Sequence, residues 1–301
     1  MSLPFVGLVT FAMVPIYAPD APAPQAAILG VPLDEGTTQH PGARYGPRTI
    51  REASTQFPYF KRGRGYYDPE RDRPMLAELE LRDAGAVDIV PTLPEESARR
   101  IGERVAALRS RGVFPVCLGG DHSITPAILA AFADTELHLV QIDAHLDFVD
   151  RLAGATRTHA SPMRRARELP HVRSLTQVGL RSIVSGVEDY QAARAAGNRL
   201  VTAAQVLTEP TADWWAGLTG DAYLTLDIDA FDPAVAPGTG FGEQGGLGFR
   251  EVAALVRSLT AHVRLRGMDL VEVNPYLDSS GRTGVLAART LLEVLAAVFD
   301  R

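Results

Sequence analysis

The sequence contains a single cysteine, Cys117, among its 301 residues. No intramolecular disulfide can form, and the cysteine content gives no sign of an oxidising compartment. Cys117 lies in the apolar run 113–118, where an unpaired thiol usually behaves as a small buried hydrophobic group. We therefore expect Cys117 to be structural.

Long apolar runs are also lacking, and none is suited to crossing a bilayer. The N-terminal stretch 3–18 is apolar, but Pro4, Gly7 and Pro15 interrupt it, and no Lys or Arg precedes Arg44. A signal peptide would place positive charge before a continuous apolar stretch. We expect a cytoplasmic protein without a membrane partner, in which residues 1–24 form an arm that packs on the domain or on a neighbouring subunit.

The sequence has no excess of basic residues, since its net charge at pH 7 is -6. Binding to nucleic acid requires a basic face, so this function is not expected. The acidic balance is compatible with a small cationic substrate. The length is sufficient for one large α/β domain.

Short apolar runs alternate with amphipathic stretches along the chain. The runs typical of buried strands are rich in Val, Leu and Ile and span residues 26–31, 113–118, 137–142, 175–179, 222–226 and 267–273. Helical spacing of apolar residues is found at 95–111, 124–132, 186–196, 249–261 and 284–299. This alternation predicts a three-layer α/β/α fold around a mostly parallel, doubly wound sheet.

The region 57–73 is aromatic, basic and rich in turn-forming residues, which predicts a long surface loop. No repeat, low-complexity tract or linker interrupts the middle of the chain. We therefore expect residues 25–301 to form a single domain.

Three polar clusters follow three of the predicted strands directly. They are GGDHS at 119–123, DAHLD at 143–147 and DIDAFDP at 227–233. Each alone could be a capped turn or a solvated loop end. Ligands of open parallel sheets bind beyond the carboxyl ends of the strands, so the clusters should meet at one rim. The groups brought together there are His122, Asp143, His145, Asp147, Asp227 and Asp229.

Four carboxylates this close together cannot all be ionised without a compensating cation. Two imidazoles and four carboxylates, with no thiolate, form an oxygen-rich set that favours Mn²⁺ over a thiolate-bound zinc or an iron–sulfur cluster. One catalytic metal ion with an open position needs fewer than six protein ligands. Two ions that share carboxylates would use all six, and such a pair activates a water molecule between the ions. The sequence therefore predicts a hydrolase with two manganese ions per subunit.

The three clusters, in this order, resemble the signatures of the ureohydrolases, the family of arginase and agmatinase. The segments 30–36, 41–47, 237–247 and 269–275 resemble other parts of that family, so the resemblance covers nearly the whole chain. It implies an arginase-like fold, a homotrimer or homohexamer, and hydrolysis of a guanidinium to urea and an amine. Asp121 and Asp232 are expected to hold turns rather than metal.

The resemblance also implies a role for each residue of the site. One manganese would be held by His122, Asp143, Asp147 and Asp227. The other would be held by Asp143, His145, Asp227 and Asp229, so that two carboxylates bridge the pair. Glu272 would pair with the planar guanidinium, Asp229 would relay a proton to the leaving nitrogen, and His159 would exchange protons with solvent.

The stretch after the second cluster bears on the substrate. Phe148 and Val149 stand where arginases have a polar asparagine, and the forms of 143–148 and 159–162 resemble the agmatinase branch. Agmatine is therefore the expected substrate, yielding putrescine and urea, a step of polyamine biosynthesis. Guanidinobutyrate, another guanidino compound or, less readily, arginine remain alternatives.

Two other classes of protein compete with this interpretation. A deacetylase of related fold would hold one zinc with an Asp-His-Asp set and would not need His122 or Asp147. A non-catalytic relative would normally have lost ligands, and all six are present. The loop 240–246 carries Gly and Gln where the family usually has prolines, which predicts a looser loop at the mouth of the pocket.

Overall fold

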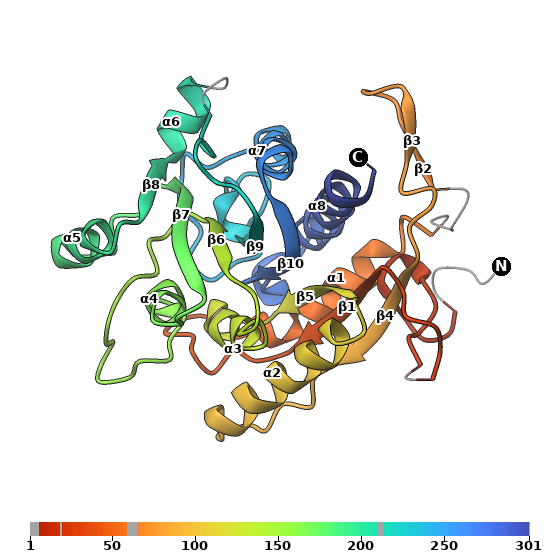
Figure 1. Ribbon diagram of the computed structural model, residues 1–301, viewed down its shortest axis with the longest axis horizontal. Coiled ribbons are helices and arrows are strands. Elements are labelled where there is room, and N and C mark those ends of the chain that lie inside the picture. The colour runs from red at the N-terminus through yellow and green to blue at the C-terminus, as the bar shows by residue number, and fades with distance from the viewer. Residues whose placement is uncertain (1–5, 19, 59–64, 210–212, 301) are drawn as a thin grey trace.

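An eight-stranded parallel sheet forms the centre of the computed structural model, which describes residues 6–18, 20–58, 65–209 and 213–300 (Figure 1). The strand order is β4-β1-β5-β10-β9-β6-β7-β8, and every pairing in it is parallel. The strands of this sheet are β1 (Ala26–Val31), β4 (Leu81–Ala86), β5 (Phe114–Gly119), β6 (Leu137–Ile142), β7 (Val172–Leu180), β8 (Arg199–Thr202), β9 (Asp221–Asp227) and β10 (Arg264–Val271).

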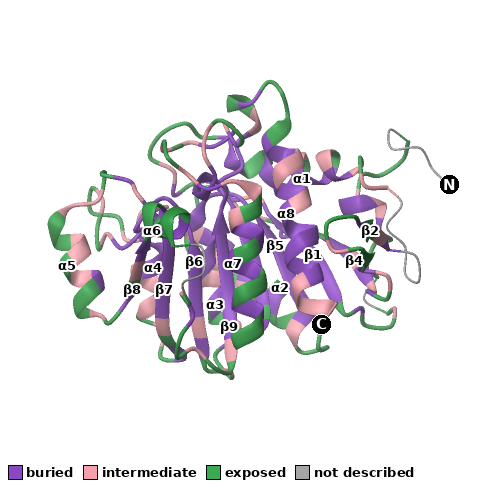
Figure 2. Cartoon of the chain, turned by 90° about the horizontal axis from the view of Figure 1, so that it is seen from above, coloured by how far each residue is buried: buried purple, intermediate pink, exposed green. Residues whose placement is uncertain are grey.

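Helices cover both faces of the sheet, which confirms the predicted three-layer α/β/α fold (Figure 2). They are α1 (Gly46–Ser54), α2 (Pro94–Arg109), α3 (Thr125–Ala130), α4 (Pro162–Arg167), α5 (Val187–Ala195), α6 (Ala203–Thr208), α7 (Phe249–His262) and α8 (Arg282–Phe299). Helix α8 packs between α1 and α7, whereas α3 packs between α2 and α4. Each group buries its own apolar core against the sheet.

Alternation along the strands supplies both cores. Ile28 and Val116 join the core of α1, α7 and α8, whereas Leu29 and Cys117 join the core of α2, α3 and α4. Successive side chains of a strand point to opposite faces, so a strand covered on both sides must be apolar throughout. Cys117 is fully buried, in agreement with its expected structural role.

The local sequence of α2 accounts for its limits. A proline stands in the first turn, where its missing N–H costs nothing, and Glu95 and Glu96 follow at the positive end of the helix dipole. Ile101, Val105 and Leu108 repeat at helical spacing and are buried. The helix therefore packs along one apolar stripe.

All six predicted strands are present, as β1, β5, β6, β7, β9 and β10, but the two edge strands were not predicted. Strand β4 carries Arg82 and Asp83, and β8 has only four residues, so neither shows a strong apolar pattern. In the predicted loop 57–73, residues 59–64 lie outside the described part. The prediction is wrong for β2 (Tyr66–Asp68), which pairs antiparallel with β3 (Arg73–Met75).

The N-terminal segment packs onto the domain. Phe11, Ala12 and Val14 are buried in the core beside α1. The Phe11 N–H donates to Asp83 at 2.9 Å, and the Ala12 N–H donates to Ser54 Oγ at 2.7 Å. The segment is thus held by both burial and hydrogen bonds.

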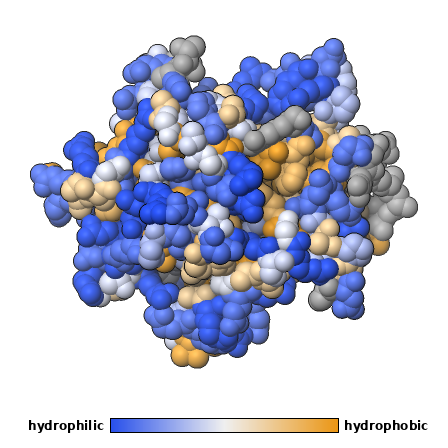
Figure 3. All heavy atoms as spheres, in the orientation of Figure 1, coloured by the Kyte–Doolittle hydropathy of each residue, from blue (hydrophilic) through white to orange (hydrophobic). Residues whose placement is uncertain are grey.

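The exposed face seen in Figure 3 is largely hydrophilic, with smaller apolar patches between the charged side chains. Among the described residues, no helix combines the length and apolarity needed to span a membrane.

A buried ion pair joins the N-terminal segment, α1 and the edge strand. Asp83 is 2% exposed and accepts hydrogen bonds from Arg51 Nε at 2.8 Å and Nη2 at 2.9 Å.

Asp83→Asn leaves this buried guanidinium without its counter-charge, and we expect a loss of about 3–5 kcal/mol in the free energy of unfolding. Urea denaturation measures it. Asp88→Asn is the matched control, because Asp88 pairs with Arg100 at the surface and should change stability by less than about 1 kcal/mol. Equal effects of the two substitutions would contradict the prediction.

Candidate active site

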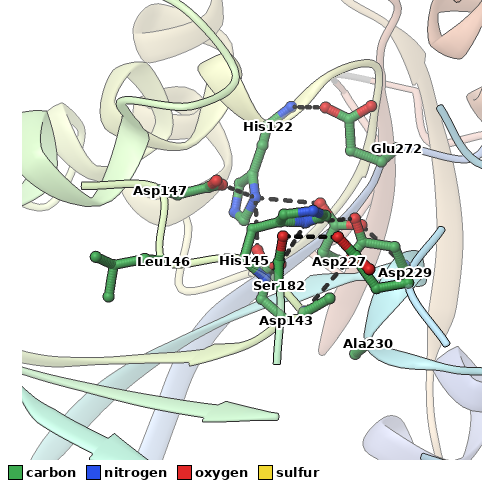
Figure 4. A network of polar contacts seen from close by, with 12 residues as sticks. His122, Asp143, His145, Leu146, Asp147, Ser182, Asp227, Asp229, Ala230 and Glu272 are labelled. Atoms are coloured by element: carbon green, nitrogen blue, oxygen red, sulfur yellow. Dashed lines mark hydrogen bonds and ion pairs between the residues drawn. The ribbon is translucent and has the colours of Figure 1, made fainter. Parts of the chain in front are cut away.

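The predicted site residues lie at the carboxyl ends of four neighbouring strands, β5, β10, β9 and β6. His122 opens the short helix η3 (His122–Ile124) after β5, and Asp227 is the last residue of β9. Asp143 follows β6 directly, and Glu272 follows β10. Figure 4 shows the side chains of His122, Asp143 and Asp227 converging, while the Glu272 carboxylate is directed at the His122 backbone N–H. The parallel register of the sheet is what brings the three sequence clusters together.

Distances between side-chain atoms divide the cluster into two groups that share one carboxylate. His122 Nδ1 lies 2.9 Å from Asp147 Oδ2 and 3.2 Å from Asp143 Oδ2. His145 Nδ1 lies 2.9 Å from Asp229 Oδ2 and 3.6 Å from Asp143 Oδ1. Each group could hold a metal ion. Asp143 is common to both groups, whereas Asp227, for which the resemblance also implies a bridging role, belongs to neither.

Asp227 adjoins the first group. Its Oδ2 lies 3.3 Å from His122 Nδ1, and its Oδ1 accepts a hydrogen bond from the Asp229 N–H at 2.9 Å. The structure therefore brings all six predicted ligands into one buried cluster. A single Asp-His-Asp set, as in the zinc deacetylase alternative, would leave His122 and Asp147 unexplained.

Two residues of the site have left-handed backbone conformations. Asp147 has φ of 51° and Glu272 has φ of 65°. Such conformations cost of order 1–3 kcal/mol for residues other than glycine and persist only where the surrounding structure enforces them. Their position at the site is consistent with side chains held in a functional orientation.

The donor atoms fit a metal better than they fit one another. His122 Nδ1 is fully buried and, despite three carboxylates within 3.3 Å, has no hydrogen-bond partner. Burial, together with the neighbouring carboxylates Asp229 and Asp143, raises the pKa of Asp227 well above its usual range. Buried carboxylates and an orphaned imidazole nitrogen around one centre are the environment that a divalent cation stabilises. The cluster thus has the chemistry of a metal site.

A chain of buried amides orients the shared carboxylate. Gln141 Nε2 donates to Asp143 Oδ2 at 2.6 Å, Gln177 Nε2 donates to Gln141 Oε1 at 2.6 Å, and Asn198 Nδ2 donates to Gln177 Oε1 at 3.1 Å. On the other side, the His145 N–H donates to Asp143 Oδ1 at 2.6 Å. Groups that hold ligating carboxylates in this way preserve the geometry of metal sites.

A second chain orients His122. Thr225 Oγ1 donates its only proton to Asp269 Oδ1. In its 2.8 Å contact with His122 Nε2, the Thr225 oxygen must therefore be the acceptor, and the imidazole N–H the donor. With Nε2 committed to Thr225, Nδ1 is the ring nitrogen that would bind a metal, once its own proton is displaced. Asp269 is fully buried and also accepts from Tyr223 at 3.0 Å. Sequence analysis assigned no role to these residues, because nothing in the pattern placed β9 beside β10.

The remaining two predicted residues face each other across the site. Glu272 Oε1 accepts from the His122 N–H at 2.9 Å and lies 3.5 Å from His159 Nδ1. The Thr38 N–H donates to His159 Nε2 at 3.3 Å, which assigns the ring proton to the nitrogen nearer Glu272. Burial alone would lower the pKa of His159, but Glu272 raises it. Thr38 was missed, because a lone threonine between two motifs carries no sequence signal.

The turn residues have the roles expected of them. Asp121 accepts from the N–H groups of Ser123 at 2.9 Å and Gly36 at 2.7 Å. Asp232 accepts from the N–H groups of Gly245 at 2.9 Å and Gly246 at 3.0 Å, so it anchors the loop 240–246. Neither belongs to the groups of metal-binding atoms found among the described residues.

A cavity of about 200 Å³ opens above the cluster. This is below the size typical of drug-sized ligand pockets, roughly 300–1,000 Å³, and so suits a small substrate. Phe241 lines it and contacts the rings of His159 and His145, with centroid distances of 5.2 Å and 6.2 Å. The predicted looseness of the loop 240–246 is offset here, since Arg181 donates to the Glu243 carbonyl at 2.8 Å.

Comparisons with known proteins agree with this geometry. The model of the arginase family matches residues 24–297. The chain is 36% identical to human mitochondrial guanidino acid hydrolase, over 91% of this chain and 78% of that protein. It is 35% identical to the guanidinobutyrase of Pseudomonas aeruginosa, over 98% and 93%, and 34% identical to the agmatinase of Bacillus subtilis, over 90% and 90%.

Solved structures show the same fold. Proclavaminate amidino hydrolase from Streptomyces clavuligerus superposes with a TM-score of 0.84 at 30% identity, covering 99% of both chains. A hypothetical agmatinase from Burkholderia thailandensis gives 0.83 at 29% identity, covering 98% of this chain and 91% of that one. The arginase-like fold expected from the sequence is therefore confirmed.

Metal binding should release protons. Burial alone would lower the pKa of both histidines, but their carboxylate neighbours raise that of His122 well above its usual value and that of His145 to about 12. In the metal-free protein both rings are therefore protonated at pH 7, and a metal must displace those protons, so apparent affinity rises with pH. Calorimetric titration with Mn²⁺ in buffers of different ionisation enthalpy should show release of one or more protons. Asp143→Asn should abolish this heat. Buffer-independent enthalpies for the unsubstituted protein would contradict the prediction.

Removing the hydroxyl that links His122 to Asp269 should weaken metal binding. We expect Thr225→Val to raise the Kd for Mn²⁺ about 10- to 100-fold, the usual effect of losing such a support. Tyr223→Phe is the matched control, because Tyr223 bonds to the same carboxylate without contacting His122. The account fails here if both substitutions weaken metal binding equally, or if neither does.

Proposed function

The chain belongs to the arginase family of guanidino hydrolases, and on this premise we propose that its substrate is agmatine, which it hydrolyses to putrescine and urea. The observation that carries the choice is that the described lining of the cavity holds no cation to pair with a substrate carboxylate. Its ionisable lining consists of Asp147, Asp227, Asp229, Glu272 and two histidines, and no Lys or Arg of the described chain lines it. Two divalent cations would offset the charge of the aspartates. A tail that ends in a carboxylate would then find no cationic side chain of the described lining to pair with.

Glu272 is placed to receive the guanidinium. One of its oxygens is occupied by the His122 N–H, and the side chain lines the cavity. A carboxylate pairs with a planar guanidinium through charge-assisted hydrogen bonds. The hydrogen bond from the His122 N–H fixes this carboxylate at the edge of the cluster.

The cluster would hold two Mn²⁺ ions, because its oxygen-rich donors without sulfur suit that metal. When bound, such a pair would supply an activated water as the nucleophile for the guanidinium carbon. Asp229, buried beside His145, is placed to carry a proton to the leaving nitrogen. His159 and Thr38 form the outer end of the path, where protons pass to solvent. Phe241 lines the cavity beside both histidine rings.

Guanidinobutyrate is the second candidate, because relatives named guanidinobutyrase and guanidino acid hydrolase are as similar to this chain as those named agmatinase. A guanidino acid would need a cation for its carboxylate. Arg181 stands behind the loop 240–246, but its guanidinium donates to the carbonyls of Asp229 and Glu243. For this reason agmatine is favoured.

Urea release tests the proposal. The Mn²⁺-loaded protein, supplied separately with agmatine, guanidinobutyrate and arginine, should release urea fastest from agmatine. Glu272→Gln should lower kcat/KM at least about tenfold, because it removes the charge of a guanidinium partner. Glu188→Gln, at an exposed acid on α5, should leave it unchanged. Faster hydrolysis of guanidinobutyrate would replace agmatine as the substrate while keeping the chemistry.

A further inference from the structure

The cavity has two unlike ends. Its inner end is formed by the carboxylates and histidines of the cluster, and its outer wall is formed by Val149, Leu152, Val184 and Phe241. Val149 and Leu152 follow β6, Val184 follows β7, and Phe241 follows β9, so the wall is assembled from three separate segments. Any substrate whose guanidinium reaches Glu272 must lay the rest of its length along this wall.

The outer wall offers a tail no charged partner. Its polar members, Thr38, Thr239 and Ser185, are hydroxyl residues. The charged groups of the adjoining loops are engaged elsewhere: Asp150 pairs with Arg165 at 2.5 Å, and Glu243 accepts from Ser182 Oγ at 2.8 Å. On this outer wall, among the described residues, neither an ammonium nor a carboxylate at the end of a substrate would meet a counter-charge.

The apolar lining extends outward to an exposed rim. The side chain of Val184 is 65% exposed although it lines the cavity, and its neighbour Ile183 is 91% exposed. Phe241 lines the same cavity as Val184, and Asp232 and Arg181 secure the loop that carries it. A rigid apolar wall that continues to the surface is suited to a chain of methylenes.

We propose that this wall recognises the substrate tail by apolar contact alone, so that the enzyme also hydrolyses n-alkylguanidines that lack any distal charge. The inference rests on the guanidine hydrolysis proposed above and names the class of tail it accepts. Water adds its oxygen to the guanidinium carbon and the bond from that carbon to the alkylated nitrogen breaks. Both water protons pass to the leaving nitrogen, so that an alkylguanidinium and water become urea and an alkylammonium.

Chain length provides the first test. Methyl-, ethyl-, propyl- and butylguanidine are supplied to the Mn²⁺-loaded protein, and both urea release and calorimetric binding are measured. Each added methylene should raise kcat/KM about fourfold, the factor expected for burying one such group. Butylguanidine should come within about tenfold of agmatine, because a solvated ammonium contributes little. Guanidinobutyrate should bind more weakly than either.

A pair of exposed valines provides the matched variants. Val184→Arg places a cation on the cavity wall and should raise the ratio of kcat/KM for guanidinobutyrate over agmatine about tenfold, since it attracts one tail and repels the other. Val187→Arg is the control. Val187 is 72% exposed on the same segment but does not line the cavity, so the ratio should not change.

The outcomes separate the two proposals. If agmatine is hydrolysed while butylguanidine is neither cleaved nor bound, the apolar tail site is wrong and the guanidine chemistry stands. If alkylguanidines bind with rising affinity but no guanidine yields urea, the tail site stands and the proposed reaction is wrong. If no guanidine binds, both are overturned.

Discussion

Repulsion among four buried carboxylates is the constraint on which the rest of this structure depends. Asp143, Asp147, Asp227 and Asp229 meet at one rim of the sheet, where burial removes the solvent that would screen them. Protons on His122 and His145 can compensate for part of this charge, and divalent cations can compensate for more of it. Without a cation, this charge repulsion raises the free energy of the folded protein. The hydrogen bonds around the cluster nevertheless keep the carboxylate oxygens directed inward, where a cation would bind.

Those supports come from the sheet itself. Buried amides on β6 and β7 hold Asp143 from one side, and Thr225 with Asp269 holds His122 from beneath. Both chains run between neighbouring strands, so the parallel pairing that makes the core also makes the site. The same architecture leaves the loops free to vary, and here they carry an apolar wall. The inner end of the cavity thus determines which reaction is catalysed, and the loops determine which substrate tails the cavity accepts.

Much of this could be predicted from the sequence, because the informative residues are local. Central strands are apolar on both faces, and each ends in a polar cluster, so both the sheet and its ligand rim were predictable. The edge strands β4 and β8 were not, since one contains a buried charge paired through tertiary contact with Arg51 and the other is very short. Thr225, Asp269, Thr38 and Phe241 could not be assigned roles either. Their roles depend on which strands and loops become neighbours, and single-chain periodicity does not specify that.

The most direct test of the central claim is a crystal structure of the Mn²⁺-loaded protein with anomalous diffraction data. The account predicts two peaks about 3.5–4 Å apart, both contacted by Asp143, with His122 Nδ1 bound to one and His145 Nδ1 to the other. A single peak, or two that do not share Asp143, would contradict it.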